Sequence, residues 1–376
     1  MITLEAGRSQ SPTKKLHNSP FSGPKINLRW LQLKLNDRLL KACRLQSVDA
    51  TPVWFMRQAG RVLPEYRKVR EKHNVISICK NPDLCAKVTA LPVETLGVDA
   101  AIMFADIMLP LEGMGVQFEI KEGLGPLIQE PIQSLDSVNS LNDLDPRNDV
   151  PFVLEAIAQA KKMLDVPLIG FSGAPFTLAS YLIEGRPTRD FVNTKTLMYR
   201  DSKTWHALMN RLAMAMASYL RAQVKAGVDV VQLFDSWVGC LSPQDYRQYV
   251  LPYSRRIFNE LEVTGVPCIH FGTGTSNLLE EMKEAGGDVF GVDWRIPIDL
   301  AWARLGSNVG IQGNLDPAVL LGSPELIKSQ AAEILAKSKG RVGHIFNLGH
   351  GMLPETSPQN VVELVKFVHD STQNSS

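Results

Sequence analysis

Two arginines that lie four residues apart are the first candidates for chemistry in this chain. Arg57 and Arg61 follow directly on the apolar run Val53–Met56, and Gln58 lies between them. On a helical turn, residues at this spacing project from one face. A guanidinium group binds carboxylate or phosphate through two parallel hydrogen bonds. The pair therefore indicates a site for an anionic ligand. The alternative is a solvated basic helix face, but Gly60 and the apolar residues before Arg57 favour the site.

Asp106 is the second candidate, because it ends a run of almost no polarity. The run is Ala-Ala-Ile-Met-Phe-Ala, residues 100–105. A carboxylate beside such a run is costly unless it is hydrogen-bonded or used in chemistry. The alternative is a structural residue, since chains exit to solvent at strand ends. The apolar context of Asp106 weakens that alternative.

Polar residues follow the other apolar runs as well. His350 lies between two glycines, where it could bind anions, donate protons or ligate a metal. A zinc site needs clustered Cys and His, but no HExxH or HxC motif occurs, so we expect no metal. The turn Gly272–Gly274 lacks the lysine and the spacing of a P-loop. Besides Asp106 and His350, the polar residues in or after the runs include Ser172, Asp235, Ser236, His270, Asp293, Asn314 and Asp316.

The elements that must position these residues are eight short apolar runs that alternate with helical patterns. The β-branched and aromatic content of the runs is typical of buried strands, and several helical patterns start with Pro near the first turn. The order predicts an α/β protein with a single (β/α)8 TIM barrel, in which chemistry lies at the carboxyl ends of the strands. A doubly wound sheet is the alternative, but the first strand–helix turn lacks a GxGxxG motif. The predicted strands are Val53–Met56, Ala100–Ala105, Pro167–Gly173, Val230–Ser236, Pro267–Gly272, Val289–Trp294, Val309–Gly313 and His344–Leu348. The predicted helices include Pro82–Leu96, Val150–Leu164, Thr188–Ala226, Pro243–Thr264, Ser276–Ala285, Pro324–Lys339 and Pro358–Asp370.

The segment Gly115–Ile132 interrupts this alternation. Two alternating runs, Val116–Lys121 and Pro126–Pro131, are joined by Glu-Gly-Leu-Gly. This pattern predicts a β-hairpin inserted after the second strand.

The composition is that of an ordinary globular protein. The 376 residues are 44% hydrophobic and 21% charged, and 40 Lys and Arg nearly balance 39 Asp and Glu. This balance gives no support for nucleic acid or membrane as a partner, and no apolar run reaches membrane-spanning length. The five cysteines form no CxxC pair, which favours reduced thiols in a cytoplasmic protein.

Residues 1–35 differ from the rest of the chain. They are rich in Ser, Pro and Lys, and Glu5 is their only acid. We expect a disordered extension there and a catalytic barrel domain over residues 36–372. A transit peptide is an alternative, but a clear amphipathic Arg-rich helix is missing.

Five motifs together resemble the uroporphyrinogen decarboxylase family. The resemblance runs in order from about Asn36 to the last predicted helix. Val62 and Gly185-Arg-Pro187 depart from the family pattern without touching a proposed catalytic group. The motifs are Pro52-Val-Trp-Phe-Met-Arg-Gln-Ala-Gly-Arg61 with Leu63-Pro-Glu-Tyr66, Gly170-Phe-Ser-Gly-Ala-Pro-Phe-Thr-Leu178 with Tyr181, Phe234-Asp-Ser236, Gly313-Asn-Leu-Asp316 and Phe346-Asn-Leu-Gly-His-Gly351.

The resemblance implies a cofactor-free enzyme that converts the four acetate side chains of uroporphyrinogen III to methyl groups, giving coproporphyrinogen III and CO2. It implies a homodimer. It also implies that Asp106 and Arg57 are catalytic, and that the substrate is bound by Arg57, Gln58, Arg61, Asp106, Tyr181, Ser236 and His350.

Two competing functions fit parts of the same pattern. The related corrinoid methyltransferases hold zinc through His and Cys, but Gly272 stands where the cysteine after His270 is expected. A non-catalytic binder of polyanions would keep the arginines and could lose Asp106, whereas this chain keeps both.

Overall fold

A seven-stranded parallel sheet forms the centre of the fold. The computed structural model describes residues 35–121 and 123–373, so the predicted extension over 1–35 lies, except for Leu35, outside the described residues. The strands are hydrogen-bonded in the order β1-β4-β5-β6-β7-β8-β9, and every pair is parallel. They are β1 (Ala101–Ile102), β4 (Leu168–Gly173), β5 (Val230–Asp235), β6 (Cys268–Gly272), β7 (Val289–Gly291), β8 (Gly310–Gln312) and β9 (His344–Ile345).

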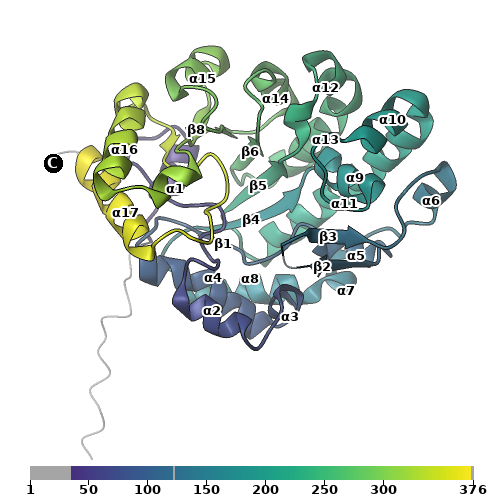
Figure 1. Ribbon diagram of the computed structural model, residues 1–376, viewed down its shortest axis with the longest axis horizontal. Coiled ribbons are helices and arrows are strands. Elements are labelled where there is room, and N and C mark those ends of the chain that lie inside the picture. Colours follow the sequence, from purple (N-terminus) through teal and green to yellow (C-terminus); the bar gives the residue numbers. More distant parts are fainter. Residues whose placement is uncertain (1–34, 122, 374–376) are drawn as a thin grey trace, which may run out of the picture. The chain divides into compact units, whose positions relative to one another are not determined.

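Helices follow the strands and cover the sheet, with α12, α13 and α14 on one side and α4 and α8 on the other in Figure 1. The α-helices are α1 (Arg38–Cys43), α2 (Pro64–Arg70), α3 (Val75–Cys79), α4 (Pro82–Leu96), α5 (Leu109–Gly113), α6 (Leu135–Asn139), α7 (Pro146–Asp149), α8 (Pro151–Met163), α9 (Pro175–Glu184), α10 (Val192–Arg200), α11 (Ser202–Ala226), α12 (Pro243–Tyr249), α13 (Leu251–Glu262), α14 (Leu279–Ala285), α15 (Ile298–Leu305), α16 (Pro324–Ser338) and α17 (Pro358–Thr372). The short 3-10 helices are η2 (Val238–Cys240) and η3 (Pro317–Leu321).

Seven of the eight predicted strand runs contain a strand, and the run Val53–Met56 makes only an isolated parallel bridge between Val53 and Phe346. This run nevertheless joins both edges of the sheet. Phe346 N donates to Pro52 O at 2.9 Å, and Asp99 N, just before β1, donates to Val53 O at 2.7 Å. The run therefore lies between β9 and β1.

Two predicted helices are wrong in extent, because each is two helices. The segment Thr188–Ala226 breaks at Asp201, whose carboxylate accepts hydrogen bonds from Thr204 N and Thr204 Oγ1 and so caps the start of α11. The segment Pro243–Thr264 breaks at Val250, where Pro252 in the first turn of α13 starts a new helix.

The segment Gly115–Ile132 contains an antiparallel pair, β2 (Phe118–Lys121) and β3 (Gly125–Ile128). Phe118 lies opposite Ile128 in this pair. The main chain ties the segment to α9, because Ile132 N donates to Leu182 O at 2.8 Å and Ile128 N donates to Gly185 O at 2.8 Å. The pair is thereby held beside the helix that carries Tyr181.

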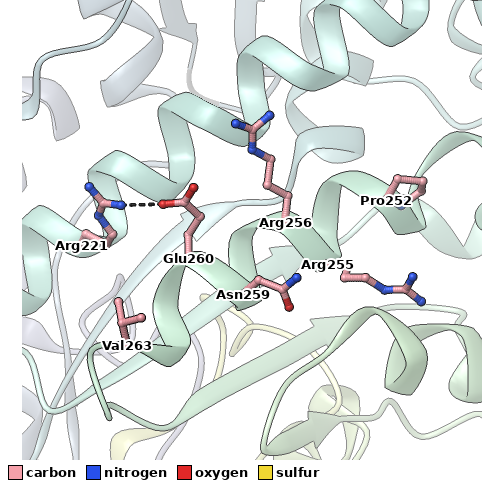
Figure 2. A pocket seen from close by; sticks show the side chains of 7 residues that line it. All are labelled: Arg221, Pro252, Arg255, Arg256, Asn259, Glu260 and Val263. Carbon is pink, nitrogen blue, oxygen red and sulfur yellow. Dashed lines mark hydrogen bonds and ion pairs between the residues drawn. The ribbon is translucent and has the colours of Figure 1, made fainter.

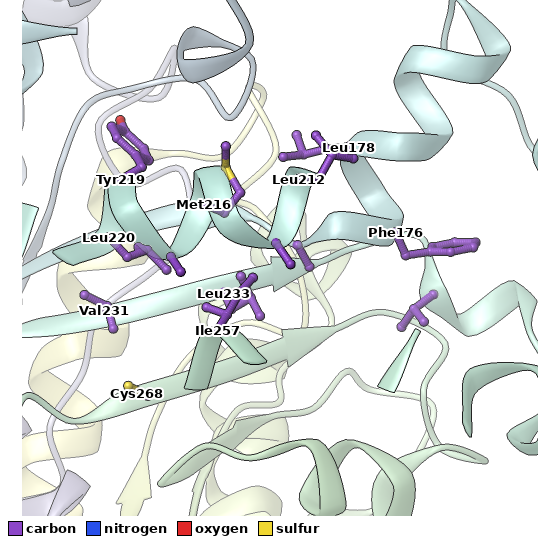
Figure 3. Close-up of a cluster of buried hydrophobic side chains, with 14 of the residues drawn as sticks. Phe176, Leu178, Leu212, Met216, Tyr219, Leu220, Val231, Leu233, Ile257 and Cys268 are labelled. Atoms are coloured by element: carbon purple, nitrogen blue, oxygen red, sulfur yellow. The ribbon is translucent and has the colours of Figure 1, made fainter. Parts of the chain in front are cut away.

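Side chains of the central strands pack alternately on the two faces of the sheet. On β5, Val230 belongs to an inner cluster with Trp54 and Ile269, whereas Val231 and Leu233 pack outward against the helices. Figure 3 shows the outer layer, in which Met216 and Leu220 of α11 face β5. Each such side chain contributes roughly 1.5–3 kcal/mol by leaving water.

A chain of buried polar groups crosses the inner layer. Trp54 Nε1 donates to Gln312 Oε1 at 3.0 Å, and Gln312 Nε2 donates to Gln232 Oε1 at 3.0 Å. These bonds join the first run, β8 and β5 across the inside of the curled sheet.

Asp99 anchors both ends of the described chain to the sheet. Its Oδ1 accepts from Asn36 at 2.8 Å and Arg38 at 3.0 Å, while its Oδ2 accepts from Val53 N at 2.8 Å and lies 2.6 Å from His369 Nε2. Burial acts to raise the pKa of Asp99, but the bonds from His369, Val53 and Asn36 outweigh it and hold that pKa below its usual value.

Candidate functional site

Arg57 leaves the first run in a left-handed backbone conformation, with φ of 63°. This φ is uncommon for a residue other than glycine. Its side chain is exposed and lies against Gly351, because a Cβ added at Gly351 would come within 2.8 Å of Arg57 Cγ and nearer still to Cδ. Gly351 has no side chain, and this leaves room for the arginine.

Arg57 and Arg61 do not share a helical turn. The left-handed Arg57 and the bends after it keep the chain irregular until α2 begins at Pro64. Arg61 is exposed on that irregular segment. The expectation that the two arginines project from one helix face is therefore wrong.

Gln58 is fully buried, and its amide is used within the fold. Its Oε1 accepts from Phe55 N at 2.9 Å, and its Nε2 donates to Ala100 O at 2.9 Å. These bonds fix the turn that carries Arg57 to the start of the β1 run. The Gln58 side chain can thus position Arg57, but it exposes no surface to a ligand.

Asp106 follows β1, and its Oδ1 accepts from Met108 N at 2.9 Å. Burial raises the pKa of the carboxyl, while the Met108 bond and the positive charge of Arg57 act to lower it. The side chain is nevertheless only partly buried by surface area. Protein atoms therefore surround a carboxyl group that solvent still reaches. An added ligand at this point would deepen the desolvation of the carboxylate and strengthen its interaction with positive charge.

Tyr181 belongs to the same electrostatic neighbourhood. It lies on α9, and its ring centroid is 6.0 Å from that of Trp237, in an edge-on contact. Burial raises the pKa of its phenol, a hydrogen bond with Trp237 acts to lower it, Asp106 raises it and Arg57 lowers it. Tyr181 of α9, Asp106 after β1 and Arg57 after the first run thus lie close enough for their charges to interact.

His350 approaches Arg57 from the loop after β9. Burial and, to a smaller extent, the positive charge of Arg57 lower its pKa to about 4, while Asp293 acts in the opposite direction. The imidazole is therefore neutral near pH 7 and can donate one N–H. Asp293 is buried and is paired with Arg295 Nη1 at 2.5 Å.

Ser236 lies directly after β5, on a partly buried turn. Its carbonyl oxygen accepts from Thr273 Oγ1 at 2.5 Å, so the turn is tied to the loop after β6. The residues on either side, Asp235 and Trp237, make contacts with α9 that the sequence does not reveal. The only hint in the sequence is that Asp235 is an acid at the end of an apolar run.

A pocket of about 480 Å³ lies elsewhere, on the outer faces of α11 and α13 (Figure 2). It is lined by Arg221, Arg255 and Arg256, among others, and each of these arginines is bonded to a partner in the chain. Arg221 pairs with Glu260 at 2.5 Å, Arg255 with Glu284 at 2.8 Å, and Arg256 donates to Asn210 at 2.7 Å. The pocket contains none of the predicted site residues, and its guanidinium charges are already partly offset.

The described part of the chain contains neither a cluster of metal-binding side chains nor a helix that could cross a membrane. Over residues 35–121 and 123–373, no group of three or more His, Cys, Asp or Glu side chains is arranged to hold a metal ion. Within the same ranges, every helix is too short or too polar to cross a membrane.

The fold and this group of residues define a class, that of parallel α/β proteins with an arginine, a carboxylate, a tyrosine and a histidine gathered at the carboxyl ends of the strands. The family model described as "Uroporphyrinogen decarboxylase (URO-D)" matches residues 34–371, and the chain belongs to this family.

Curated relatives match almost the whole described chain. The protein named uroporphyrinogen decarboxylase from Thermus thermophilus is 54% identical over 336 residues, which cover 89% of this chain and 98% of that protein. The one from Carboxydothermus hydrogenoformans is 50% identical over 338 residues, covering 89% and 97%.

Solved structures of lower identity show the fold alone. A methyltransferase from Methanosarcina mazei has a TM-score of 0.74 at 21% identity, covering 90% of this chain and 99% of that one. A putative vitamin-B12 independent methionine synthase from Listeria monocytogenes has a TM-score of 0.53 at 12% identity, covering 88% and 98%.

Proposed function

We propose that this chain is a carboxy-lyase that decarboxylates the four acetate side chains of uroporphyrinogen III, giving coproporphyrinogen III and CO2, in tetrapyrrole biosynthesis. The observation that carries the proposal is the grouping of Arg57, Asp106 and Tyr181, because a polyanionic ring with inward N–H donors needs both cationic clamps and a carboxylate. The names of relatives that are 50–54% identical over 89% of the chain support the same activity.

We infer further that the described fold is one complete (β/α)8 TIM barrel over residues 36–372. The run Val53–Met56 is its first strand, since its main chain bonds to both β9 and the start of β1. The pair β2–β3 is a hairpin inserted after the second strand. The carboxyl ends of eight strands then surround one site.

The reaction needs a sink for the electron pair that the departing CO2 leaves behind. A proton adds to the α carbon of the pyrrole ring, next to the ring carbon that bears the acetate, which makes the ring a cation. The bond to the carboxylate breaks, CO2 leaves, and its electron pair neutralises that cation as an exocyclic methylene. A second proton adds to the methylene carbon, and the proton on the ring carbon departs. The net change is the consumption of one proton and the release of one CO2 at each acetate.

Asp106 acts as the carboxylate that accepts the pyrrole N–H bonds and offsets the ring cation. Its interaction grows as positive charge develops, so it stabilises the transition state more than the bound substrate. The bond from Met108 and the charge of Arg57 both favour its ionised form, against the burial that opposes it. The porphyrinogen would bring the N–H donors that a desolvated carboxylate needs.

The remaining residues bind and orient the substrate. Arg57 and Arg61 clamp carboxylates, and Arg57, near Asp106, also holds the water or hydronium that delivers a proton. Tyr181, Ser236 and the neutral His350 donate hydrogen bonds to side-chain carboxylates. Gln58 serves the site through the turn of Arg57.

Anaerobic incubation with uroporphyrinogen, followed by chromatography of the oxidised products, tests the activity and its mechanism. Asp106→Asn keeps the size and removes the charge, so turnover falls by roughly two to three orders of magnitude, as for the loss of one preorganised electrostatic group. Porphyrinogen binding weakens less. Arg57→Lys, the matched control, keeps its charge and loses the fork, so carboxylate binding suffers as well. Near-normal turnover of a folded Asp106→Asn protein refutes the electrostatic role.

We propose that the enzyme uses no metal, flavin or pyridoxal cofactor. Exhaustive chelation leaves its activity unchanged under this proposal. Activity that vanishes on chelation and returns only with zinc would instead support the methyltransferase chemistry.

We propose a homodimer in the cytoplasm, with neither nucleic acid nor membrane as a partner. The dimer rests on the family resemblance, and the location on the unpaired cysteines. Sedimentation at micromolar concentration gives a dimer under this proposal, and a monomer contradicts it.

A further inference from the structure

Asp235 is a buried carboxyl group that the proposed mechanism does not use. It ends β5, its side chain has no exposed surface, and its Oδ2 has no hydrogen-bond partner among the described residues. A buried polar atom without a partner costs roughly 1–3 kcal/mol.

The other oxygen of Asp235 belongs to a closed set of contacts between two strand ends. Thr177 Oγ1 on α9 donates to Asp235 Oδ1 at 3.1 Å, and the same hydroxyl accepts from Trp237 N at 3.3 Å. The Trp237 ring then contacts Tyr181, which lies one helical turn after Thr177. This set of contacts therefore includes both sequence neighbours of Ser236, Asp235 and Trp237.

We propose that Asp235 is a positioning residue, which locks the turn carrying Ser236 to the helix carrying Tyr181. This inference rests on the proposed function, in which Ser236 and Tyr181 bind carboxylates of the substrate. While Asp235 and Thr177 are in contact, the hydroxyl groups of Ser236 and Tyr181 stay at a fixed distance from each other. Without the contact, the turn is joined to α9 by the longer Trp237 N–Thr177 Oγ1 bond of 3.3 Å, while the Thr273 bond ties it to the loop after β6.

The carboxyl group of Asp235 lies in an environment that disfavours its ionised form. Burial raises the pKa of Asp235 to about 7, and the Thr177 bond alone opposes this shift. Within the described chain, the ionisable groups that face it are the Tyr246 phenol of α12 and the Cys240 thiol of η2. Burial raises both of their pKa values, that of Cys240 to about 11, and Lys195 of α10 acts on the thiol. No charged neighbour therefore compensates the carboxylate, and the Thr177 hydroxyl is the group that stabilises its ionised form.

Steady-state kinetics with uroporphyrinogen separate this role from a merely structural one. Thr177→Val removes the hydroxyl, and we expect its KM to rise about tenfold with kcat nearly unchanged, while Thr177→Ser restores KM to within twofold. Asp235→Asn keeps an acceptor oxygen, so its KM stays within twofold of the parent at pH 6. The double variant Thr177→Val with Asp235→Asn is no worse than Thr177→Val alone.

Matched controls distinguish the possible failures. Asp229→Asn, at the opposite end of β5, removes a carboxylate paired with Lys161 and leaves KM within twofold. The inference is overturned if Thr177→Val behaves like Asp229→Asn, or if the double variant has a higher KM than Thr177→Val alone. Tyr181→Phe and Ser236→Ala test the underlying assumption. If these two leave KM unchanged, the proposed binding roles fail; if they raise it while Thr177→Val does not, only the positioning role fails.

Discussion

Because Asp235 is buried, we predict that the variant Asp235→Asn becomes more stable relative to the parent protein as the pH rises. Its carboxyl is fully buried and its pKa lies near 7 instead of the ordinary 3.8. The folded state holds its proton more tightly than the unfolded state does. This group therefore contributes no destabilisation below about pH 4, and it costs stability progressively as the pH rises to 7, above which the cost is constant.

The magnitude follows from the two pKa values. At about 1.36 kcal/mol for each pKa unit, ionising Asp235 costs the folded state roughly 4 kcal/mol above pH 7. Asp235→Asn removes that cost, but it buries an amide N–H2 that lacks a partner, at roughly 1–3 kcal/mol whatever the pH. The variant is therefore near the parent in stability at pH 5. Its advantage grows by roughly 2–3 kcal/mol between pH 5 and pH 8.

Urea denaturation, followed by tryptophan fluorescence, gives the free energy of unfolding of the parent and of Asp235→Asn at pH 5 and at pH 8. The quantity of interest is how the difference between the two proteins changes with pH. Groups common to both proteins cancel, so only the titration of residue 235 remains. Thr177→Val serves as the comparison, because it removes the one bond that favours the ionised carboxylate and so steepens the loss of stability with pH. A stability difference between Asp235→Asn and the parent that is the same at both pH values, within about 0.5 kcal/mol, refutes the reasoning.

Three further predictions concern other parts of the chain. Gly351→Ala places a methyl against the Arg57 side chain, so we expect turnover to fall at least tenfold with little change in thermal stability, which paired assays would show. Asp99→Asn leaves Arg38 and His369 without their shared carboxylate, and roughly 3 kcal/mol of stability is lost. Because the pKa of Asp99 is depressed, the parent loses that contribution as the pH falls through this pKa, and acid denaturation curves of parent and variant should converge there. Deleting residues 1–30 leaves turnover nearly unchanged, since the family match begins at residue 34; a tenfold drop, about 1.4 kcal/mol of barrier, contradicts this.

The strands were predictable from the sequence because a buried strand is marked by the composition of its own residues and of those that flank it. The run Pro167–Gly173 differs from β4 by one residue, and Pro267–Gly272 differs from β6 by one residue. Apolar content and flanking Pro and Gly are sufficient to find such segments. Helix breaks are harder, since the apolar period continues across Asp201 and only the cap interrupts the backbone.

The site was predictable in part. The type of residue after each run pointed to Asp106 and His350, but residue type does not show where an amide points, so Gln58 gave no sign that its side chain turns inward. The contacts of Thr177 with Asp235 and with Trp237 join residues that are 58 and 60 positions apart in the chain. Contacts of that range depend on how α9 packs on β5, which no local pattern encodes.

The hydrogen bonds of Asp99 also limit the order in which parts of the chain can fold while it is being synthesised. The first run pairs with Phe346, and the carboxylate that fixes it also contacts His369, 270 positions later in the chain. A nascent chain that ends before Phe346 therefore has an unpaired strand edge at Val53, and one that ends before α17 has a buried acid without one of its partners. An exposed strand edge can pair with other chains, so the first run is open to aggregation until residues far along the chain have been synthesised.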